Sequence, residues 1–186
     1  MGVSNTHSCA LPIGVSCRTL TRHDDSRGWF AELFRDEWDT GYKPVQWNLA
    51  LSNARTLRGM HLHLIHWDYL VVPSGSMLLN LKDLRAQSPT RGLVAAVTLN
   101  QSPLTSWIIP PGVAHGFYFP EPSMHVYSVS EYWCLADELG CRWDDPDLGV
   151  TWPDRVPTLS ERDRNAPSYA ELMDRIAGVD FPIQTA

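Results

Sequence analysis

The chain has 186 residues, of which 44% are hydrophobic and 19% are charged, and this composition excludes a disordered chain. Its length suits one sizeable core, so we predict a single domain over residues 1–186. The net charge is −6 and the chain has no block of like charges, which argues against nucleic acid as a partner. No stretch has the ~20 apolar residues of a membrane helix.

Short apolar runs separated by glycine, proline, asparagine and aspartate predict many β-strands. Residues 45–51 and 60–63 alternate polar and apolar side chains with a period of two, as half-buried strands do. Turn signals recur every ~8–12 residues, which favours an all-β sandwich or barrel. We predict strands near residues 15–21, 28–35, 45–52, 56–63, 67–73, 76–82, 93–99, 105–109, 114–119 and 124–133.

One segment close to the C-terminus predicts a helix. Pro167 and Ser168 form its start signal, apolar residues follow at helical spacing from Tyr169 to Ile176, and Gly178 forms its stop signal. The expected fold class is therefore all-β with a C-terminal helix.

The cysteines and the N-terminus indicate a cytoplasmic protein. Cys9, Cys17, Cys134 and Cys141 form no Cys-x-x-Cys pair, and a chain of this size does not need disulfides to hold its core. Residues 1–20 lack the basic start and apolar run of a signal peptide. We expect reduced thiols.

Four of the seven histidines are placed as a functional group would be. His61 and His63 are two apart on a predicted strand, so their side chains point to the same face. His66 follows in the next turn, and His115 follows a Pro-Gly turn. Two chemistries fit this pattern, a general base and a metal site.

As a general base, a histidine oriented by a carboxylate can take a proton from the carbon beside a ketone. As metal ligands, His61, His63, Asp68 and His115 resemble the two-part metal motif of cupins, in which the carboxylate is usually glutamate. The first interpretation needs no cofactor, and the second needs one divalent metal ion.

Eight short motifs occur in one order between about residues 20 and 170. Together they resemble the dTDP-4-dehydrorhamnose 3,5-epimerase family. The motifs are Asp25–Phe30 with Glu32, Gln46 with Asn48, Leu57–His61, Asp83–Arg85 with Ser88–Thr90, Ile109–Phe117, Val126–Tyr127 with Glu131–Tyr132, Asp144–Leu148 with Trp152–Pro153, and Leu159–Asp163.

This resemblance implies a double-stranded β-helix jelly roll of the cupin type, a homodimer, and a dTDP-4-keto-6-deoxyhexose substrate inverted at C3, C5 or both. It implies that His61 is the base, that Asp163 orients it, and that Tyr127 returns a proton from the opposite face. The substrate contacts it implies are Gln46, Asn48 and Arg58 for the sugar, Arg27 for the diphosphate from its own or the neighbouring subunit, Phe30, Tyr132 and Trp143 for the thymidine, and Glu32 and His115 elsewhere in the site.

The sequence departs from this family at three places. Asp68 stands where the family usually has a lysine, and a carboxylate repels an enolate that a lysine would stabilise. His63 replaces a glutamine, and Leu79-Asn80 replaces Asp-Val. The first two changes complete the set of metal ligands, and a metal on His61 would prevent that residue from acting as the base.

Three alternatives to the plain epimerase follow from these departures. The first is a metal-dependent cupin enzyme, and the second is a dTDP-sugar 3,4-ketoisomerase, whose family also places His-x-His on a jelly-roll strand. The third is a non-catalytic cupin that binds a sugar nucleotide. The joint presence of His61, Tyr127 and Asp163 favours the epimerase.

Overall fold

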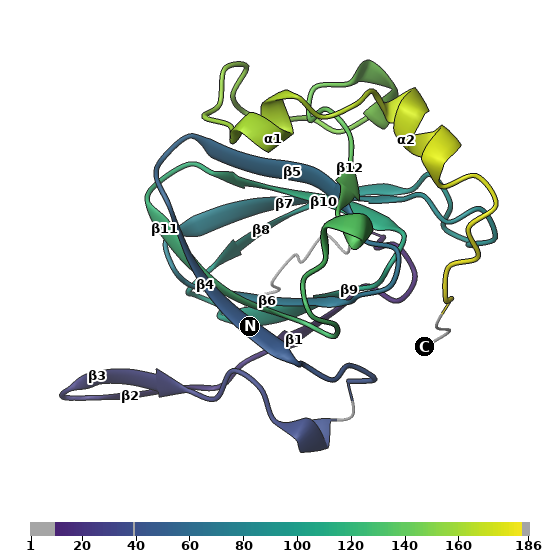
Figure 1. Ribbon diagram of the computed structural model, residues 1–186. Coiled ribbons are helices and arrows are strands. Elements are labelled where there is room, and N and C mark those ends of the chain that lie inside the picture. Colours follow the sequence, from purple (N-terminus) through teal and green to yellow (C-terminus); the bar gives the residue numbers. More distant parts are fainter. Residues whose placement is uncertain (1–9, 39, 184–186) are drawn as a thin grey trace.

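Two antiparallel five-stranded sheets face each other in the computed structural model, which describes residues 10–38 and 40–183 (Figure 1). This arrangement agrees with the predicted jelly roll. The first sheet has the order β1 (Ser16–Thr19), β9 (Thr105–Ile109), β6 (Asp68–Ser74), β11 (Ser123–Val129) and β4 (Gln46–Ser52). The second has the order β12 (Leu139–Gly140), β5 (Thr56–Leu62), β10 (Val113–Phe119), β7 (Ser76–Asp83) and β8 (Val94–Asn100).

A hairpin of β2 (Arg22–Asp25) and β3 (Gly28–Ala31) forms a separate two-stranded sheet that projects from the body (Figure 1). Every predicted strand segment contains a strand, but β2 and the two-residue β12 were not predicted. The residues of β2 are all polar and exposed, so they carry no apolar alternation. The prediction was also too long for β11, which ends at Val129 rather than at residue 133.

The main core fills the space between the two sheets. Its side chains come mainly from the inward-facing positions of both sheets. These residues are Val15, Leu70, Val72, Met77, Leu79, Leu81, Ala95, Leu99, Trp107, Ile109, Val113 and Phe119.

A second core lies on the outer face of the second sheet, under the C-terminal segment. Helix α2 (Tyr169–Arg175) confirms the predicted C-terminal helix, and Ser168 caps it by accepting a hydrogen bond from the backbone N–H of Glu171. The short helix α1 (Glu161–Arg164) was not predicted. Three 3-10 turns complete the elements, at Asp36–Trp38 (η1), Leu135–Asp137 (η2) and Pro146–Leu148 (η3).

The thiols agree with the expectation of reduced cysteines as far as the structure describes them. Cys17, Cys134 and Cys141 are free, and Cys9 lies outside the described residues. Within the described ranges, no helix has the length and apolar character needed to cross a membrane.

Candidate active site

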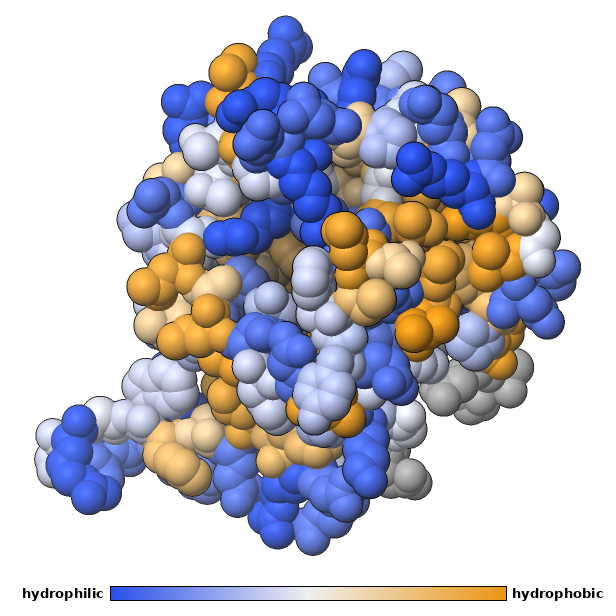
Figure 2. All heavy atoms as spheres, viewed as in Figure 1, coloured by the Kyte–Doolittle hydropathy of each residue, from blue (hydrophilic) through white to orange (hydrophobic). Residues whose placement is uncertain are grey.

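A pocket of about 260 Å³ opens between the two sheets, on the side of β4 and β5. Figure 2 shows polar and apolar side chains mixed around this side of the molecule. The pocket brings together seven of the residues that the sequence predicted for the site, namely Gln46, Asn48, Arg58, His61, His115, Tyr127 and Asp163.

His61 and Asp163 form a hydrogen-bonded pair on one wall of the pocket. His61 Nε2 lies 2.7 Å from Asp163 Oδ1, although the two residues are 102 positions apart in the chain. Asp163 is buried in the first turn of α1, where its own N–H donates to the capping Ser160 Oγ at 3.0 Å. Burial would raise the pKa of Asp163, but the hydrogen bond and electrostatic attraction of His61, with smaller contributions from Ser160 and Arg162, together lower it. The ionised carboxylate can therefore orient the imidazole.

A β-bulge in β5 turns Arg58 and His61 into the same pocket. His61 pairs with His115 of β10 while Arg58 pairs with Phe117, so two residues of β5 stand opposite one of β10. Without the bulge, side chains three apart on a strand would point to opposite faces. Gly59 lies inside the bulge at φ +123°, a conformation that favours glycine.

The opposite wall comes from β11 and β4 of the first sheet. Tyr127 pairs in register with Asn48, and the side chain of Gln46 donates to Asn48 Oδ1 at 2.9 Å. Burial, together with the carboxylates of Asp68 and Glu138, raises the pKa of Tyr127. Its hydroxyl is therefore protonated at neutral pH and can act as an acid.

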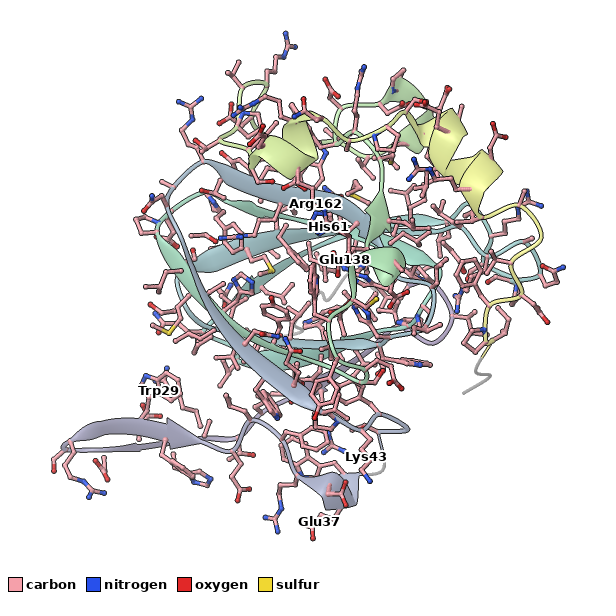
Figure 3. All side chains as sticks on the ribbon, viewed as in Figure 1. Trp29, Glu37, Lys43, His61, Glu138 and Arg162 are labelled. Carbon is pink, nitrogen blue, oxygen red and sulfur yellow. The ribbon has the colours of Figure 1, made fainter. Side chains whose placement is uncertain are left out.

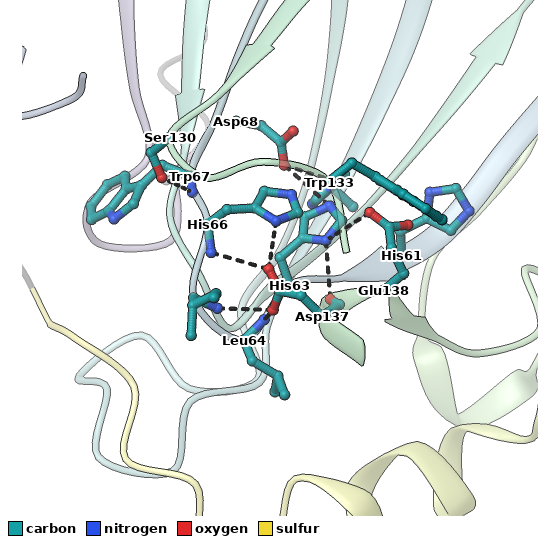
Figure 4. A network of polar contacts seen from close by, with 12 residues as sticks. His61, His63, Leu64, His66, Trp67, Asp68, Ser130, Trp133, Asp137 and Glu138 are labelled. Atoms are coloured by element: carbon teal, nitrogen blue, oxygen red, sulfur yellow. Dashed lines mark hydrogen bonds and ion pairs between the residues drawn. The ribbon is translucent and has the colours of Figure 1, made fainter. Parts of the chain in front are cut away.

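The inner end of the pocket holds a buried cluster around Asp68 (Figure 4). Asp68 Oδ2 lies 3.3 Å from His63 Nε2 and 3.4 Å from His115 Nε2. Burial lowers the pKa of His115 to about 3 and also lowers that of His63. Burial and the nearby carboxylates of Glu138 and Asp137 raise the pKa of Asp68.

His66 belongs to this cluster, and His61 does not. One ring or carboxylate atom from each of His63, His66 and Asp68 lies within 4.8 Å of the others. His61 is directed at Asp163 instead, and Figure 4 shows its ring apart from those of His63 and His66. The predicted ligand set of His61, His63, Asp68 and His115 is therefore not gathered as one group.

Five predicted substrate contacts lie outside the pocket. Arg27 and Phe30 lie on the projecting hairpin, where Arg27 forms an exposed ion pair with Asp25 at 2.6 Å. In Figure 3, the labelled Trp29 of the same hairpin lies well away from His61 in the pocket. The other three are Glu32, which pairs with Arg35, the exposed Tyr132, and Trp143, whose carbonyl accepts the indole N–H of Trp152.

The sequence did not predict several pocket residues. Glu138 and Arg162 form an ion pair at 2.6 Å, and Figure 3 places both in the region of His61 beneath α1. No sequence signal marked Glu138, whereas Arg162 is adjacent to Asp163 in a quoted motif. The others are Ala50, Leu70, Phe117, His125, Val129, Trp133 and Ser160, whereas His66 was one of the four histidines that the sequence singled out without a role.

Comparisons with known proteins agree with this architecture. The sequence profile of the family described as dTDP-4-dehydrorhamnose 3,5-epimerase matches residues 11–171. A Streptomyces griseus protein named dTDP-4-dehydrorhamnose 3,5-epimerase is 35% identical over 161 residues, which covers 81% of this chain and 80% of the relative. A Streptomyces bikiniensis protein named dTDP-4-dehydro-6-deoxyglucose 3-epimerase is 34% identical over 158 residues, covering 80% and 81%.

Solved structures of similar fold come from the same family. The crystal structure of a double mutant of ChmJ, described as a 3'-monoepimerase from Streptomyces bikiniensis in complex with dTDP, superposes with a TM-score of 0.82 at 30% identity and covers 92% of each chain. This similarity confirms the cupin-type jelly roll.

Proposed function

This chain belongs to the dTDP-4-dehydrorhamnose 3,5-epimerase family, and from that membership we propose that it inverts a carbon beside the ketone of a dTDP-4-keto-6-deoxyhexose. The relatives include enzymes named as 3,5-epimerases and as 3-epimerases. The observation that carries the proposal is the contact of 2.7 Å between His61 and Asp163, on a pocket whose other wall presents Tyr127.

His61 removes the proton in this proposal. The hydrogen atom on a carbon beside a ketone is acidic because the resulting negative charge spreads onto the ketone oxygen as an enolate. Since Asp163 is a buried carboxylate bonded to the ring, it orients His61 and stabilises the imidazolium that forms. This pairing supports a base rather than a metal ligand at His61.

Tyr127 returns the proton in this proposal. Inversion requires that the new proton reach the carbon from the face opposite to the base. Tyr127 comes from the first sheet and His61 from the second, so the two side chains reach the pocket from opposite walls. The raised pKa of Tyr127 supports a protonated hydroxyl in this role.

We assign the sugar contacts to Gln46, Asn48 and Arg58, which line the pocket with the proposed acid and base. We assign the diphosphate and thymidine contacts to Arg27, Phe30 and neighbouring residues of a second subunit, because the hairpin lies away from the pocket of its own chain. A guanidinium such as that of Arg27 binds phosphate oxygens in a bidentate manner. The active form in this proposal is a homodimer.

The decisive experiment follows deuterium entering dTDP-4-keto-6-deoxyglucose in D₂O, by NMR. The wild-type protein should incorporate deuterium at C3, C5 or both, and the labelled positions identify the inverted carbons. His61→Ala should slow this exchange by about 10²–10⁴-fold, which is the usual contribution of a general base. Tyr127→Phe should retain exchange but lose inversion, because only the returning acid is removed.

The exposed Arg175→Ala, on α2 and outside the pocket, is the control, and its exchange rate should equal that of the wild type. Exchange that persists unchanged in His61→Ala would refute the proposed base. Movement of the keto group from C4 to C3 would instead establish the ketoisomerase. Substrate binding without any exchange in the wild type would establish the non-catalytic binder.

A further inference from the structure

The three buried histidines around Asp68 all have their Nδ1 atoms committed as hydrogen-bond donors. His66 Nδ1 lies 2.5 Å from Asp137 Oδ2, His115 Nδ1 lies 3.1 Å from the carbonyl of Val113, and His63 Nδ1 lies 3.4 Å from the carbonyl of Asp137. Carbonyl oxygens can only accept, so the ring nitrogens that face them must carry the hydrogen. In a neutral imidazole, the Nε2 atom is then left with a lone pair.

Asp137 has the same effect on His66. Its carboxylate already accepts the backbone N–H groups of Leu64, Ile65 and His66 at 2.5, 3.0 and 3.3 Å. It holds the turn between β5 and β6, and through that turn it sets the orientation of the His66 ring. A carboxylate that orients an imidazole through Nδ1 is the usual arrangement behind a histidine that binds a metal through Nε2.

The Nε2 atoms of these histidines lie around the carboxylate of Asp68, and among the described residues there are too few hydrogen-bond donors to satisfy all of them. Those of His63 and His115 both face Asp68 Oδ2, at 3.3 and 3.4 Å. His66 Nε2 is buried, and no described residue offers it a hydrogen-bond partner. One proton could join Asp68 to only one of the three imidazoles. A cation bound between these groups would satisfy the lone pairs and the carboxylate together.

We propose that this cluster binds one divalent transition-metal ion through His63, His66 and the carboxylate of Asp68, whose ligand atoms lie within 4.8 Å of one another. His115, whose Nε2 lies 3.4 Å from Asp68 Oδ2, completes the set as the ion binds. A tetrahedral ion with bonds of about 2.0–2.1 Å separates its ligand atoms by about 3.3–3.4 Å, which agrees with the two contacts of Asp68. Imidazole nitrogens with one carboxylate suit Zn²⁺ and Fe²⁺ rather than Mg²⁺ or Ca²⁺. The rings of His63 and His66 stack, with their centroids 3.6 Å apart and an angle of 30° between their planes (Figure 4).

This metal site does not use His61 as a ligand. His61 is engaged with Asp163 and is replaced among the ligands by His66, which lies in the turn before β6. A base and a metal ion can therefore be present in one pocket.

The ion would also reverse the charge at the inner end of the pocket, where Asp68 and Glu138 lie. Two carboxylates repel an enolate, whereas a divalent cation stabilises the oxygen on which its charge develops. This role as a Lewis acid rests on the proposed function, but binding of the ion does not.

The test is a titration of chelator-treated, substrate-free protein with Zn²⁺ by calorimetry, and with Co²⁺ by visible absorption. We expect about one ion per chain and the intense visible bands of a four-coordinate Co²⁺ site. Saturating Zn²⁺ should also raise the melting temperature of the wild type, since the ion binds the native state. Absence of binding and of a melting shift in the wild type would overturn the site.

The variants distinguish the ligands. His66→Gln and Asp68→Asn should bind Zn²⁺ more than ~10-fold more weakly, because even loss of a residue behind a ligand weakens metal binding by about 10–100-fold. His61→Ala should bind with the wild-type affinity, and so should His125→Gln, a matched control. His125 is also buried in the pocket, and its Nδ1 atom has no hydrogen-bond partner among the described residues. A loss in His61→Ala equal to that in His66→Gln would refute this ligand set.

Proton exchange measured with and without chelator separates the two proposals. Exchange that is unaffected by chelation would overturn the role as a Lewis acid, whereas the titrations decide on the site itself. The rate in His61→Ala decides independently on the base.

Discussion

Asp83 belongs to one of the motifs that resembled the family, and its contacts stabilise the fold. Its side chain is fully buried and lies outside the pocket. It accepts hydrogen bonds from Arg85 Nη2 at 2.8 Å and from the hydroxyls of Ser88 and Thr90, both at 2.6 Å. Arg85 in turn donates to the carbonyl of Ile13 at 2.6 Å. The motif therefore ties the turn after β7 to the N-terminal segment.

We predict that Asp83→Asn lowers the free energy of unfolding by about 3–5 kcal/mol, because it leaves the buried Arg85 charge unpaired. The measurement is urea unfolding at pH 7. The control is Asp24→Asn, which removes an exposed ion pair with Arg22 and should change stability by less than about 1 kcal/mol. Equal effects of the two variants would contradict this assignment.

The same residue makes stability depend on pH. Burial would raise the pKa of Asp83, but hydrogen bonds from Arg85, Ser88 and Thr90 lower it. A lowered folded pKa means that the stabilisation is present above the unfolded pKa of ~3.9 and is lost as pH falls through the folded value. The acid-induced loss of stability below about pH 4 should therefore be shallower in Asp83→Asn than in the wild type.

Strand β5 directs two side chains into the site because of its bulge. Arg58 and His61 both face the pocket, while Met60 and Leu62 pack into the core under the helices. The bulge requires close approach of two backbones, since a Cβ atom on Gly59 would lie 2.7 Å from Gly116 Cα and 2.9 Å from the carbonyl of His115. The strand can therefore hold this register only with glycine at this position.

We predict that Gly59→Ala destabilises the protein by more than Gly28→Ala and also reduces proton exchange. Both glycines have a positive φ, +123° at Gly59 and +134° at Gly28, but an added Cβ meets no atom within 4 Å at Gly28. Gly28→Ala should show the strain alone, about 1–3 kcal/mol. Thermal unfolding of both variants measures the difference. Similar losses would show that the close approach in β5 is tolerated.

At the scale of the whole molecule, two features indicate association with a second copy. The edge strand β4 exposes Trp47, Leu49 and Leu51 on its outer face, and Figure 2 shows apolar surface on this side. The hairpin of β2 and β3 extends past the body of its own subunit with Trp29 and Phe30 exposed. Both features support the proposed homodimer.

A complementation experiment tests whether the hairpin serves the neighbouring site. His61→Ala lacks the proposed base and Arg27→Ala lacks the proposed phosphate contact, so each homodimer should be impaired. In randomly mixed dimers, about a quarter of all sites would have both residues intact, and activity should recover toward that fraction. Sedimentation analysis checks that the mixture is dimeric. Mixed dimers without recovery would place Arg27 in its own subunit's site or outside any site.

The sequence alone determined where most strands lie along the chain, the family and the members of the proposed catalytic pair. The alternation of polar and apolar residues over 45–51 predicted β4, because successive side chains of a strand point to opposite faces and only one face is buried. The motifs around His61 and Asp163 identified both residues before any contact was known. The hairpin strand β2 was missed because a fully exposed strand has no hydrophobic pattern.

Only the tertiary structure decided which histidine belongs to which group. His61 and His63 look equivalent in the sequence, but one meets Asp163 and the other Asp68. His66 joined the cluster because Asp137, 71 residues later, orients its ring. These choices depend on contacts between distant segments, and local spacing carries no information about them.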